Sequence, residues 1–289
     1  MRPLWRPSLF MIPTLKEKTV LITGATDGLG KETAKRVAAA GATVLLHGRN
    51  KTKGASVKEE IVVATGNEAI YYYNADFSSL QEVKQLSEEV LSNHSSLHVL
   101  INNAAIGGGP KGEATRELSK DGYELRFAVN HLSHFLLTQN LLPLLKASAP
   151  ARVVNVSSIG QSPLNFDDLQ LEKRYQSFDA YCKSKLAQIL YGFSLAETLK
   201  DAGIAVNSLH PATLMDTNMV HRYFGKVSAT VAEGADAVMQ LAFAEDTAGV
   251  TGAFFNQLTD ARANTQAYDE AARKKLWQTS EDLAKAYLL

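Results

Sequence analysis

The chain has 289 residues, a formal net charge of zero at pH 7, 45% hydrophobic residues and 21% charged residues. These proportions are typical of an ordinary globular protein, and the balanced charge gives no reason to expect nucleic acid or an anionic surface as a partner. The single cysteine, Cys182, excludes an internal disulfide and a cysteine-rich metal site, so we predict a reducing, cytoplasmic location.

Residues 1–15 predict an irregular N-terminal tail. Their opening, MRPLWRPSLFMIP, contains two arginines and three prolines, which interrupt any continuous apolar run. No apolar run elsewhere approaches the roughly 20 residues that span a bilayer, so we predict no transmembrane segment. Residues 16–289 are predicted to form a single domain, because no composition break or repeat divides them.

From residue 19 onward, apolar runs alternate with helical patterns. The apolar runs predict strands at 19–23, 43–48, 69–76, 97–105, 151–158, 204–211 and 251–256. Helical spacing of apolar residues predicts helices at 29–42, 51–65, 79–93, 121–146, 178–201, 229–244 and 268–289. Strands that alternate with helices of about a dozen residues form βαβ units. The predicted fold class is therefore α/β: a Rossmann-type, doubly wound sheet of about seven parallel strands with helices on both faces.

A glycine-rich turn, TGATDGLG at residues 23–30, follows the first strand and opens the first helix. Its glycines let the backbone turn tightly and approach a pyrophosphate, and the helix N-terminus supplies free amides. The spacing differs from the G-x-G-x-x-G of many dinucleotide sites, and a purely structural turn is the alternative. We predict that the turn binds a dinucleotide through Gly24, Thr26, Asp27, Gly28, Leu29 and Gly30.

The residues after the second strand bear on the choice of cofactor. NAD sites usually carry an acid about 20 residues after the glycines, which holds the ribose hydroxyls. Here the first acid after that strand is Glu59, and Arg49 and Asn50 occupy the strand end. A guanidinium pairs well with a 2′-phosphate, so we predict NADP(H), with NAD(H) as the less favoured cofactor. The alternative is that Arg49 is only a solvated surface charge.

The third and fourth strands end in small or polar residues. Asp76, followed by Phe77, could accept a hydrogen bond from the adenine amino group, or it could cap the next helix. Asn103, Ala104 and Ala105 leave room for a flat ring or a ribose, although Asn103 could instead tie neighbouring strands together. Ligands of such sheets lie at the carboxyl ends of the strands, so we predict that all five residues contact the cofactor.

The segment FDAYCKSKLAQILYGF, residues 178–193, places Tyr181 and Lys185 four residues apart on a predicted helix. Residues four apart share a helical face, so the Lys185 ammonium would lie beside the Tyr181 phenol. A nearby positive charge lowers the pKa of a phenol and makes it a useful acid or base. Chance also produces such pairs, and an ordinary surface pair is the alternative.

Five motifs in one order resemble those of the short-chain dehydrogenase/reductase family. They are TGATDGLG, NNAA, Asn130 within VNHLSHFLL, NVSS and YCKSK, and the resemblance covers about residues 16–260. Within the family, AVNHLSHFLLT, the long gap between NVSS and the tyrosine, and NSLHPA resemble the retinol-dehydrogenase-like branch. The resemblance implies a Rossmann fold and hydride transfer between a nicotinamide cofactor and an alcohol or carbonyl compound.

The resemblance also implies roles for four catalytic residues. Tyr181 would protonate the carbonyl oxygen during reduction, and Lys185 would lower the pKa of Tyr181 and hold the nicotinamide ribose. Ser158 would donate a hydrogen bond to the substrate oxygen as it gains charge. Asn130 would organise a water that links Lys185 to solvent. The alternatives are that Asn130 is a polar helix-interior residue bonded to the backbone and that Ser158 simply ends a strand.

Three positions depart from the family pattern. Ala105 replaces the glycine of the usual NNAG, and Ala212 follows Pro211 where the family usually has glycine. We still predict that the backbone from Pro211 to Thr213 lines the nicotinamide end of the site. Asp27 stands where NADP-preferring relatives often have Lys or Arg, which weakens the cofactor prediction without reversing it.

Two segments without a regular pattern flank the predicted site, at residues 159–177 and 214–228. Loops of this length are usually binding loops or lids. The second is rich in apolar residues and favours a small apolar carbonyl or alcohol substrate, unless these residues pack on the sheet. His131 and His134 lack an obvious third ligand, so we predict no metal site.

Together these features predict an NADP(H)-dependent alcohol dehydrogenase or carbonyl reductase that acts on CH–OH donors. The alternative is a non-catalytic NADP(H)-binding redox sensor or scaffold, which would have no need of all four catalytic residues. Epimerisation or dehydration of a sugar is disfavoured, because the chain has no obvious second domain for a nucleotide sugar. A homodimer or homotetramer is compatible with the sequence, and the C-terminal helix could cover the site or a partner.

Overall fold

The computed structural model describes residues 14–289 apart from residues 111 and 224. Most of the predicted N-terminal tail, residues 1–13, therefore lies outside the described residues. Leu15, at the end of that tail, is only 2% exposed and packs in the core with helix α1 (Gly28–Ala39). Its N–H donates to the Ala40 carbonyl at 2.9 Å, so regular packing begins before the first strand.

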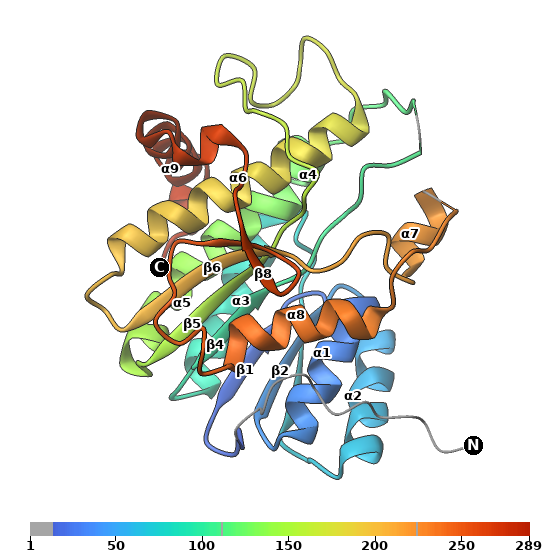
Figure 1. Ribbon diagram of the computed structural model, residues 1–289, viewed down its shortest axis with the longest axis vertical. Coiled ribbons are helices and arrows are strands. Elements are labelled where there is room, and N and C mark those ends of the chain that lie inside the picture. Colours follow the sequence, from blue (N-terminus) through green and yellow to red (C-terminus); the bar gives the residue numbers. More distant parts are fainter. Residues whose placement is uncertain (1–13, 111, 224) are drawn as a thin grey trace.

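The described residues form a single eight-stranded sheet in the order β3-β2-β1-β4-β5-β6-β7-β8 (Figure 1). The strands are β1 (Thr19–Ile22), β2 (Thr43–Gly48), β3 (Ile70–Asn74), β4 (Val99–Asn102), β5 (Ala151–Val156), β6 (Ile204–His210), β7 (Phe254–Asn256) and β8 (Thr259–Ala261). The first seven strands pair in parallel, which confirms the predicted α/β, Rossmann-type sheet. The strand order reverses beside β1, where such sheets bind their ligands.

The eighth strand was not predicted from the sequence. β8 pairs antiparallel with β7 and thus adds one reversed strand to the seven predicted parallel strands. The two strands are joined by a tight turn in which Gln257 has a φ of +57°. A strand of three residues without an apolar run has no signal of its own, and pairing with β7 alone defines it.

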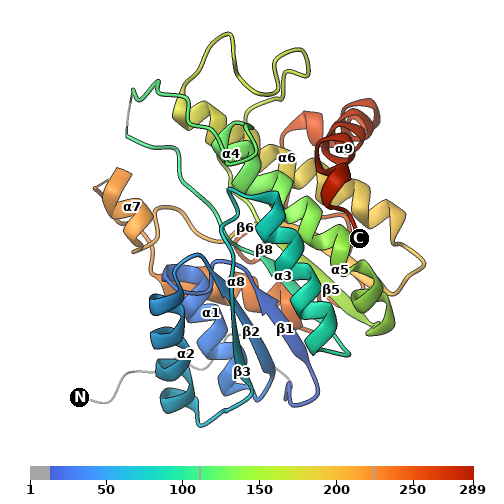
Figure 2. The same cartoon turned by 180° about the vertical axis from the view of Figure 1, so that it is seen from behind.

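Helices cover both faces of the sheet (Figures 1 and 2). One layer contains α1, α2 (Lys51–Thr65) and α8 (Val231–Phe243), and the other contains α3 (Leu80–Asn93), α5 (Ser133–Ala147) and α6 (Ser177–Thr198). Short helices are α4 (Leu125–Phe127), α7 (Asn218–Tyr223), η2 (Thr265–Tyr268) and η3 (Lys285–Tyr287). None of the helices in the described part of the chain is long and apolar enough to cross a membrane.

The C-terminal helix α9 (Glu270–Ala284) packs against the outer side of the α5–α6 layer. Its Trp277 ring lies 5.7 Å from the Phe135 ring of α5 and 5.6 Å from the Tyr191 ring of α6, measured between centroids. Leu276 of α9 is fully buried in the same core. The helix that we considered as a cover for the site or a partner therefore covers this core.

Alternate residues of the central strands face opposite helical layers. Leu21 of β1 and Leu45 of β2 belong to the core of the α3–α5–α6 layer, whereas Val20 and Ile22 belong to the core of the α1–α8 layer. All four are fully buried. A strand that is covered on both faces needs apolar residues at every position, which explains the continuous apolar runs in the sequence.

A π-helical turn, η1 (Ala128–Leu132), interrupts the long helix that the sequence predicted at 121–146. The observed helix begins at Leu125 with α4, widens through η1 and continues as α5. Single π turns are rare and occur frequently at functional sites. This one contains Asn130.

Candidate active site

The turn after β1 folds so tightly that Gly24 and Gly30 have no room for side chains. Gly24 has a φ of +64°, and a Cβ there would lie 2.8 Å from the Ala104 Cα. A Cβ on Gly30 would lie 2.3 Å from the Gly24 carbonyl oxygen and 2.5 Å from Asn103 Nδ2. Bare backbone at a helix N-terminus is what a pyrophosphate requires, so the turn fits a dinucleotide.

Asp27 caps α1 and joins three elements. Its Oδ1 accepts a hydrogen bond from Gly28 N at 2.8 Å, and its Oδ2 accepts from Lys53 Nζ at 2.6 Å and from Asn218 Nδ2 at 2.7 Å. Burial acts to raise the pKa of Asp27, but these hydrogen bonds outweigh burial and hold the pKa below its usual value. Asp27 therefore ties the phosphate turn to α2 and α7, a link that was not predicted from the sequence.

Arg49 and Asn50 follow a strand end that packs on the glycine turn. A Cβ on Gly48 would lie 2.6 Å from Thr26 Cγ2, so β2 ends directly against the turn. Asn50 caps α2, with its Oδ1 accepting from Lys53 N at 2.9 Å. Arg49 is exposed and makes no ion pair with another residue that the structure describes.

Asp76 is held by neighbours at the end of β3. Its Oδ1 accepts the backbone N–H of Ser78 at 3.0 Å, and its Oδ2 pairs with Lys120 Nζ at 3.3 Å. Burial acts to raise its pKa, but these interactions hold the pKa below its usual value. Ser79, not Asp76, is the N-cap of α3, so the capping alternative is wrong. The next residue, Phe77, stacks on a buried imidazole of β2 with 4.1 Å between centroids.

Asn103 bonds to the end of β1. Its Nδ2 donates to the Thr23 carbonyl at 2.8 Å and to the Gly24 carbonyl at 3.2 Å. The backbone N–H groups of Asn103 and Ala104 both donate to Thr23 Oγ1, at 2.8 and 2.9 Å. Asn103 therefore ties neighbouring strand ends together, and Ala104 and Ala105 place only methyl groups beside it.

Ser158 and Tyr181 meet at the carboxyl edge of the sheet, where Ser158 follows β5 and Tyr181 lies in the first turns of α6. Burial raises the pKa of Tyr181, and a hydrogen-bonding contact with the Ser158 hydroxyl opposes that rise. Ser158 Oγ also accepts from Gly160 N at 3.0 Å, which fixes the hydroxyl. Folding thus brings together a phenol and a hydroxyl that are 23 positions apart.

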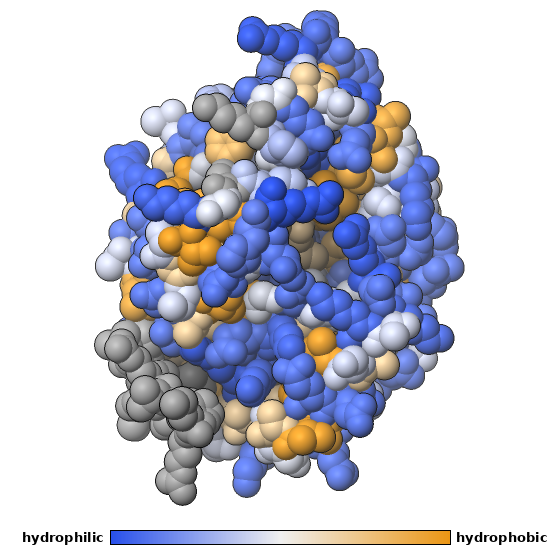
Figure 3. Space-filling view, turned by 90° about the vertical axis from the view of Figure 1, so that its right-hand side faces the viewer, coloured by the Kyte–Doolittle hydropathy of each residue, from blue (hydrophilic) through white to orange (hydrophobic). Residues whose placement is uncertain are grey.

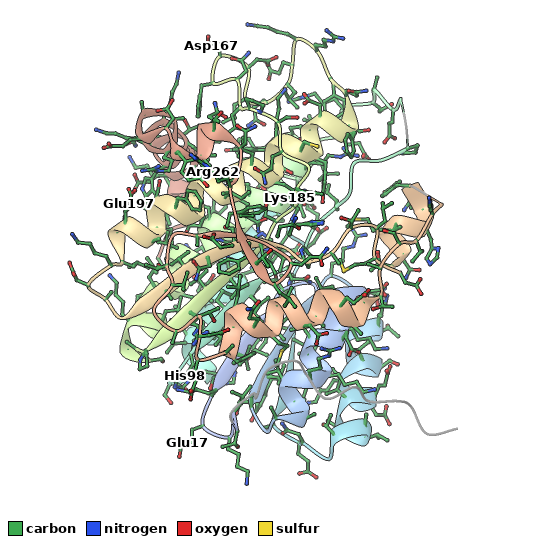
Figure 4. The ribbon with its side chains drawn as sticks, in the orientation of Figure 1. Glu17, His98, Asp167, Lys185, Glu197 and Arg262 are labelled. Atoms are coloured by element: carbon green, nitrogen blue, oxygen red, sulfur yellow. The ribbon has the colours of Figure 1, made fainter. Side chains whose placement is uncertain are left out.

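Lys185 lies one turn after Tyr181, near the centre of the molecule (Figure 4). Its side chain is enclosed, with the residue only 2% exposed, and Nζ donates to the Val156 carbonyl at 2.8 Å and to Gln188 Oε1 at 3.3 Å. Burial lowers its pKa to about 7. Among the described residues no hydrogen bond joins the ammonium to the Tyr181 phenol, although the two residues lie four positions apart on the same helix.

Asn130 is fully buried in the π turn and faces α6. Its Oδ1 accepts from Ile106 N at 2.9 Å, and its Nδ2 donates to the Ile106 carbonyl at 3.1 Å and to Ser184 Oγ at 2.9 Å. Its own carbonyl lies 3.1 Å from His134 Nδ1. The side chain thus bonds to the backbone of the loop after β4, as the structural alternative supposed.

The segment after β6 closes on itself beside the site. Pro211 and Ala212 are buried, and the Thr213 carbonyl accepts from Ser228 Oγ at 2.7 Å. The positive φ of +48° belongs to Leu214. Ala212 is not among the described residues with a positive φ, so alanine fits where the family usually has glycine.

The predicted loop 214–228 contains the helix α7 and reaches across the site. A Cβ on Gly28 would lie 3.0 Å from Thr217 Cγ2, and a Cβ on Gly107 would lie 2.9 Å from Met219 Cγ and 3.1 Å from Tyr223 Cδ2. The segment therefore extends from the phosphate turn to the loop after β4. Figure 3 faces this side of the molecule, where apolar patches interrupt a mainly hydrophilic surface that is hollowed near its centre.

Not all of this segment covers the site. A Cβ on Gly234 of α8 would lie 2.3 Å from Met215 Sδ, and Met215 packs against the core of the α1–α8 layer. The alternative that apolar residues of 214–228 pack on the body of the protein is thus correct for Met215. Met219 and Tyr223 instead contact the Gly107 loop.

A buried ionic network anchors the other loop, residues 159–177. Arg126 donates through Nε to the Gly107 carbonyl at 2.9 Å and through a terminal nitrogen to the Tyr175 hydroxyl. That hydroxyl donates to Glu124 Oε1 at 3.0 Å, and Gln170 Oε1 accepts from Glu124 N at 2.8 Å. This network was not predicted from the sequence, because its hydrogen-bonded partners lie up to about 50 positions apart and share no periodicity.

The histidines near the site have structural partners. His134 Nε2 lies 3.0 Å from Thr23 Oγ1, and His131 Nε2 lies 2.8 Å from Ser280 Oγ of α9. Within the described residues, no group of three or more His, Cys, Asp or Glu side chains could hold a metal ion.

Comparison with known proteins agrees with this architecture. The family model described as short chain dehydrogenase matches residues 18–227. Retinol dehydrogenase 12 of Homo sapiens is 37% identical, over 93% of this chain and 87% of that protein. Retinol dehydrogenase 11 of Homo sapiens is 38% identical, over 93% of this chain and 86% of that protein.

Solved structures share the fold, and two of them were crystallised with a nicotinamide cofactor. A Mycobacterium paratuberculosis protein of unassigned function superposes with a TM-score of 0.78 and 29% identity, covering 95% of this chain and 96% of its own. An Escherichia coli CFT073 putative short chain dehydrogenase complexed with NADPH superposes with a TM-score of 0.69 and 28% identity, covering 85% of this chain and 98% of its own. A Brucella melitensis 3-ketoacyl-(acyl-carrier-protein) reductase complexed with NADH superposes with a TM-score of 0.66 and 25% identity, covering 83% of this chain and 96% of its own. Sheet order, motif order and these matches together show that the chain belongs to the short chain dehydrogenase family, as an oxidoreductase of the retinol-dehydrogenase-like type that uses a nicotinamide cofactor.

Proposed function

We propose that this protein is an NADP(H)-dependent oxidoreductase that interconverts an apolar alcohol and its aldehyde or ketone. The observation that carries the proposal is the meeting of Ser158 and Tyr181 at the sheet edge, with Lys185 one helical turn further along α6. A hydroxyl donor, a phenol acid and a buried cation beside a glycine turn suit carbonyl reduction. A protein that only binds a dinucleotide needs none of the three.

In the reducing direction, a nicotinamide cofactor bound at this site would supply the hydride that the carbonyl carbon receives. Tyr181 then donates its phenolic proton to the carbonyl oxygen, and the Ser158 hydroxyl stabilises the negative charge on that oxygen as the proton moves. In the oxidising direction Tyr181 accepts the proton of the alcohol. Because burial alone raises the pKa of Tyr181, the phenol needs a positive charge nearby to act as a base.

Lys185 provides that charge in this proposal. Three N–H donors belong to its ammonium, and the Val156 carbonyl and the Gln188 amide oxygen occupy two of them. The third donor is then available to the cofactor ribose or to Tyr181. Asn130 supports the same region, since its side chain holds the Ile106 backbone and Ser184 of the catalytic helix.

The proposed cofactor contacts lie at the carboxyl ends of the strands. Gly24, Gly28 and Gly30 would leave the pyrophosphate open to backbone amides, and Arg49 would pair with the adenosine 2′-phosphate. One structural relative was crystallised with NADPH and another with NADH, so Arg49 is the feature that favours NADP(H) in this chain. Asp76 and the backbone from Pro211 to Thr213 would contact the adenine and nicotinamide ends.

An apolar substrate is supported by the side chains that cover the site. Met219 and Tyr223 of α7 lie on the Gly107 loop, and Phe178 stacks near Tyr181 with 6.2 Å between ring centroids. The names of the curated relatives specify retinol, an apolar alcohol, for those proteins. A cytoplasmic location and a homodimeric or homotetrameric assembly stay predictions from the sequence.

The test is NADPH oxidation by the purified protein against a panel of apolar aldehydes and ketones. We expect Tyr181→Phe to lower kcat by about 1,000-fold, because proton transfer by a positioned acid contributes about 10² to 10⁴. The control is Tyr191→Phe, which removes a buried hydroxyl from the same helix away from Ser158. Equal activity of Tyr181→Phe and wild type would refute the proposed role. NADPH binding without any turnover would favour the redox sensor.

A further inference from the structure

Gln188 lies one turn after Lys185 on α6 and is fully buried. Its Oε1 accepts from Lys185 Nζ at 3.3 Å, and its Nε2 donates to the Asn102 carbonyl at 3.3 Å. A backbone carbonyl can only accept, so Asn102 fixes the orientation of the amide and turns its oxygen toward the ammonium. Gln188 thereby bridges Lys185 to the end of β4, directly before Asn103.

The charged form of the buried Lys185 side chain is stabilised by neutral hydrogen-bond acceptors. Of the elements packed around it, α6 contributes Tyr181 and α5 contributes His134 as titratable groups. Burial lowers the pKa of His134 to about 3, so this imidazole is uncharged at neutral pH. Strands β4 and β5 contribute the carbonyls of Asn102 and Val156, which do not titrate. No carboxylate in the described chain pairs with Lys185, so each neutral acceptor has a large effect on its charge.

We infer that Gln188 is a positioning residue, whose amide oxygen keeps the Lys185 ammonium charged and held within reach of Tyr181 and the cofactor. The inference rests on the proposed function for the role of Lys185 in turnover. The contact itself does not depend on that role. The Val156 carbonyl is fixed by the sheet, whereas Gln188 is the acceptor that a side-chain substitution can remove.

Two substitutions of Gln188 should shift the pKa of Lys185 in opposite directions. Gln188→Met keeps the length of the side chain but removes the acceptor, so the charged form of Lys185 loses support and its pKa falls. Gln188→Glu places a carboxylate beside the ammonium, so the pKa rises. We expect the high-pH limb of the kcat/KM profile to shift down by about 0.5 to 1 pH unit in Gln188→Met and to shift up in Gln188→Glu. A merely structural role would lower activity in both variants without opposite shifts.

Gln139→Met is the matched control. Gln139 lies on α5, is partly buried and donates through Nε2 to the Tyr191 hydroxyl at 3.1 Å, so the same exchange removes one side-chain hydrogen bond away from Lys185. Its pH profile should superimpose on that of the wild type. The melting temperatures of all variants are measured first, so that each profile is collected on folded protein.

A second readout does not require turnover. The Lys185 Cε signal of protein labelled with ¹³C-lysine, assigned by its loss in Lys185→Arg, reports the protonation of this side chain directly. We expect a lower titration midpoint in Gln188→Met and a higher one in Gln188→Glu. Midpoints equal to the wild-type value in both folded variants would overturn the inference, whatever Tyr181→Phe does. Absence of turnover with shifted midpoints would count against the proposed function alone.

Discussion

Arg49 and Lys53 are two cations near the phosphate turn with different surroundings. Lys53 Nζ lies 2.6 Å from Asp27 Oδ2, whereas Arg49 is exposed and has no acidic partner among the described residues. A cation that is already paired must lose its partner before it can bind a phosphate. Arg49 needs no such exchange and can offer two parallel N–H donors to one phosphate.

Replacing Arg49 with Gln should therefore change the choice of cofactor. We expect the Kd for NADPH to rise about 10- to 100-fold, since a hydrogen bond to a charged group contributes about 1.5–3 kcal/mol, while the Kd for NADH stays unchanged. Fluorescence titration of both cofactors measures this. Lys51→Gln, at an exposed neighbouring position of α2, is the control. A similar loss for both cofactors would contradict the assignment of Arg49 to the 2′-phosphate.

Residues at strand ends were predictable because the ligands of a parallel sheet bind at the carboxyl ends of its strands. Ser158 follows that rule, whereas Tyr181 and Lys185 were predicted from their spacing of four residues on a helix. Arg126 and Gln188 were missed, because each acts through a partner whose nearness only the fold creates: the Gly107 carbonyl for Arg126 and the Lys185 ammonium for Gln188. Neither residue stands in a motif or at a strand end.

At the scale of elements, long helices and buried strands were predicted closely, because their periodicity extends over many residues. Three short features were not: the π turn Ala128–Leu132, the helix Asn218–Tyr223 and the strand Thr259–Ala261. Each is six residues or fewer, too short for a periodic pattern. Each is defined by contacts with other segments, such as the hydrogen bond between Asn218 and Asp27.

The glycine turn gives an element-scale prediction. A Cβ on Gly30 would lie 2.3 Å from the Gly24 carbonyl oxygen, so Gly30→Ala must push α1 away from the ends of β1 and β4. We expect affinity for NADPH to fall at least about tenfold and the melting temperature to fall by several degrees. Gly249→Ala is the control, because a Cβ there meets nothing within 4 Å. Unchanged NADPH binding in Gly30→Ala would show that the turn does not hold the pyrophosphate.

For the whole molecule, four enclosed histidines link stability to pH. Burial lowers the pKa of His47 and His210 to about 4 and that of His131 and His134 to about 3. In the unfolded chain each returns to about 6.5 and binds a proton more readily. Their contribution to stability is therefore complete above pH 6.5 and is lost as the pH falls toward their folded values.

We expect the free energy of unfolding to decline steeply below about pH 6, with each of these histidines adding up to about 1.4 kcal/mol per pH unit. Urea titrations between pH 7 and pH 4.5 measure the slope. His131→Gln should reduce the slope by roughly one such increment, because it removes one buried imidazole. A pH-independent unfolding energy over this range would contradict the prediction.

The reversed strand β8 has a consequence for contacts between molecules. It forms one border of the sheet, two of its three residues are exposed, and one of those is the charged Asp260. Border strands with free backbone groups are templates on which other chains add and aggregate. In the β7–β8 hairpin, β8 pairs with the free edge of β7. The new edge strand is too short and too polar to pair stably with a strand of another molecule. At this end of the sheet, β8 therefore protects the protein against aggregation through added strands.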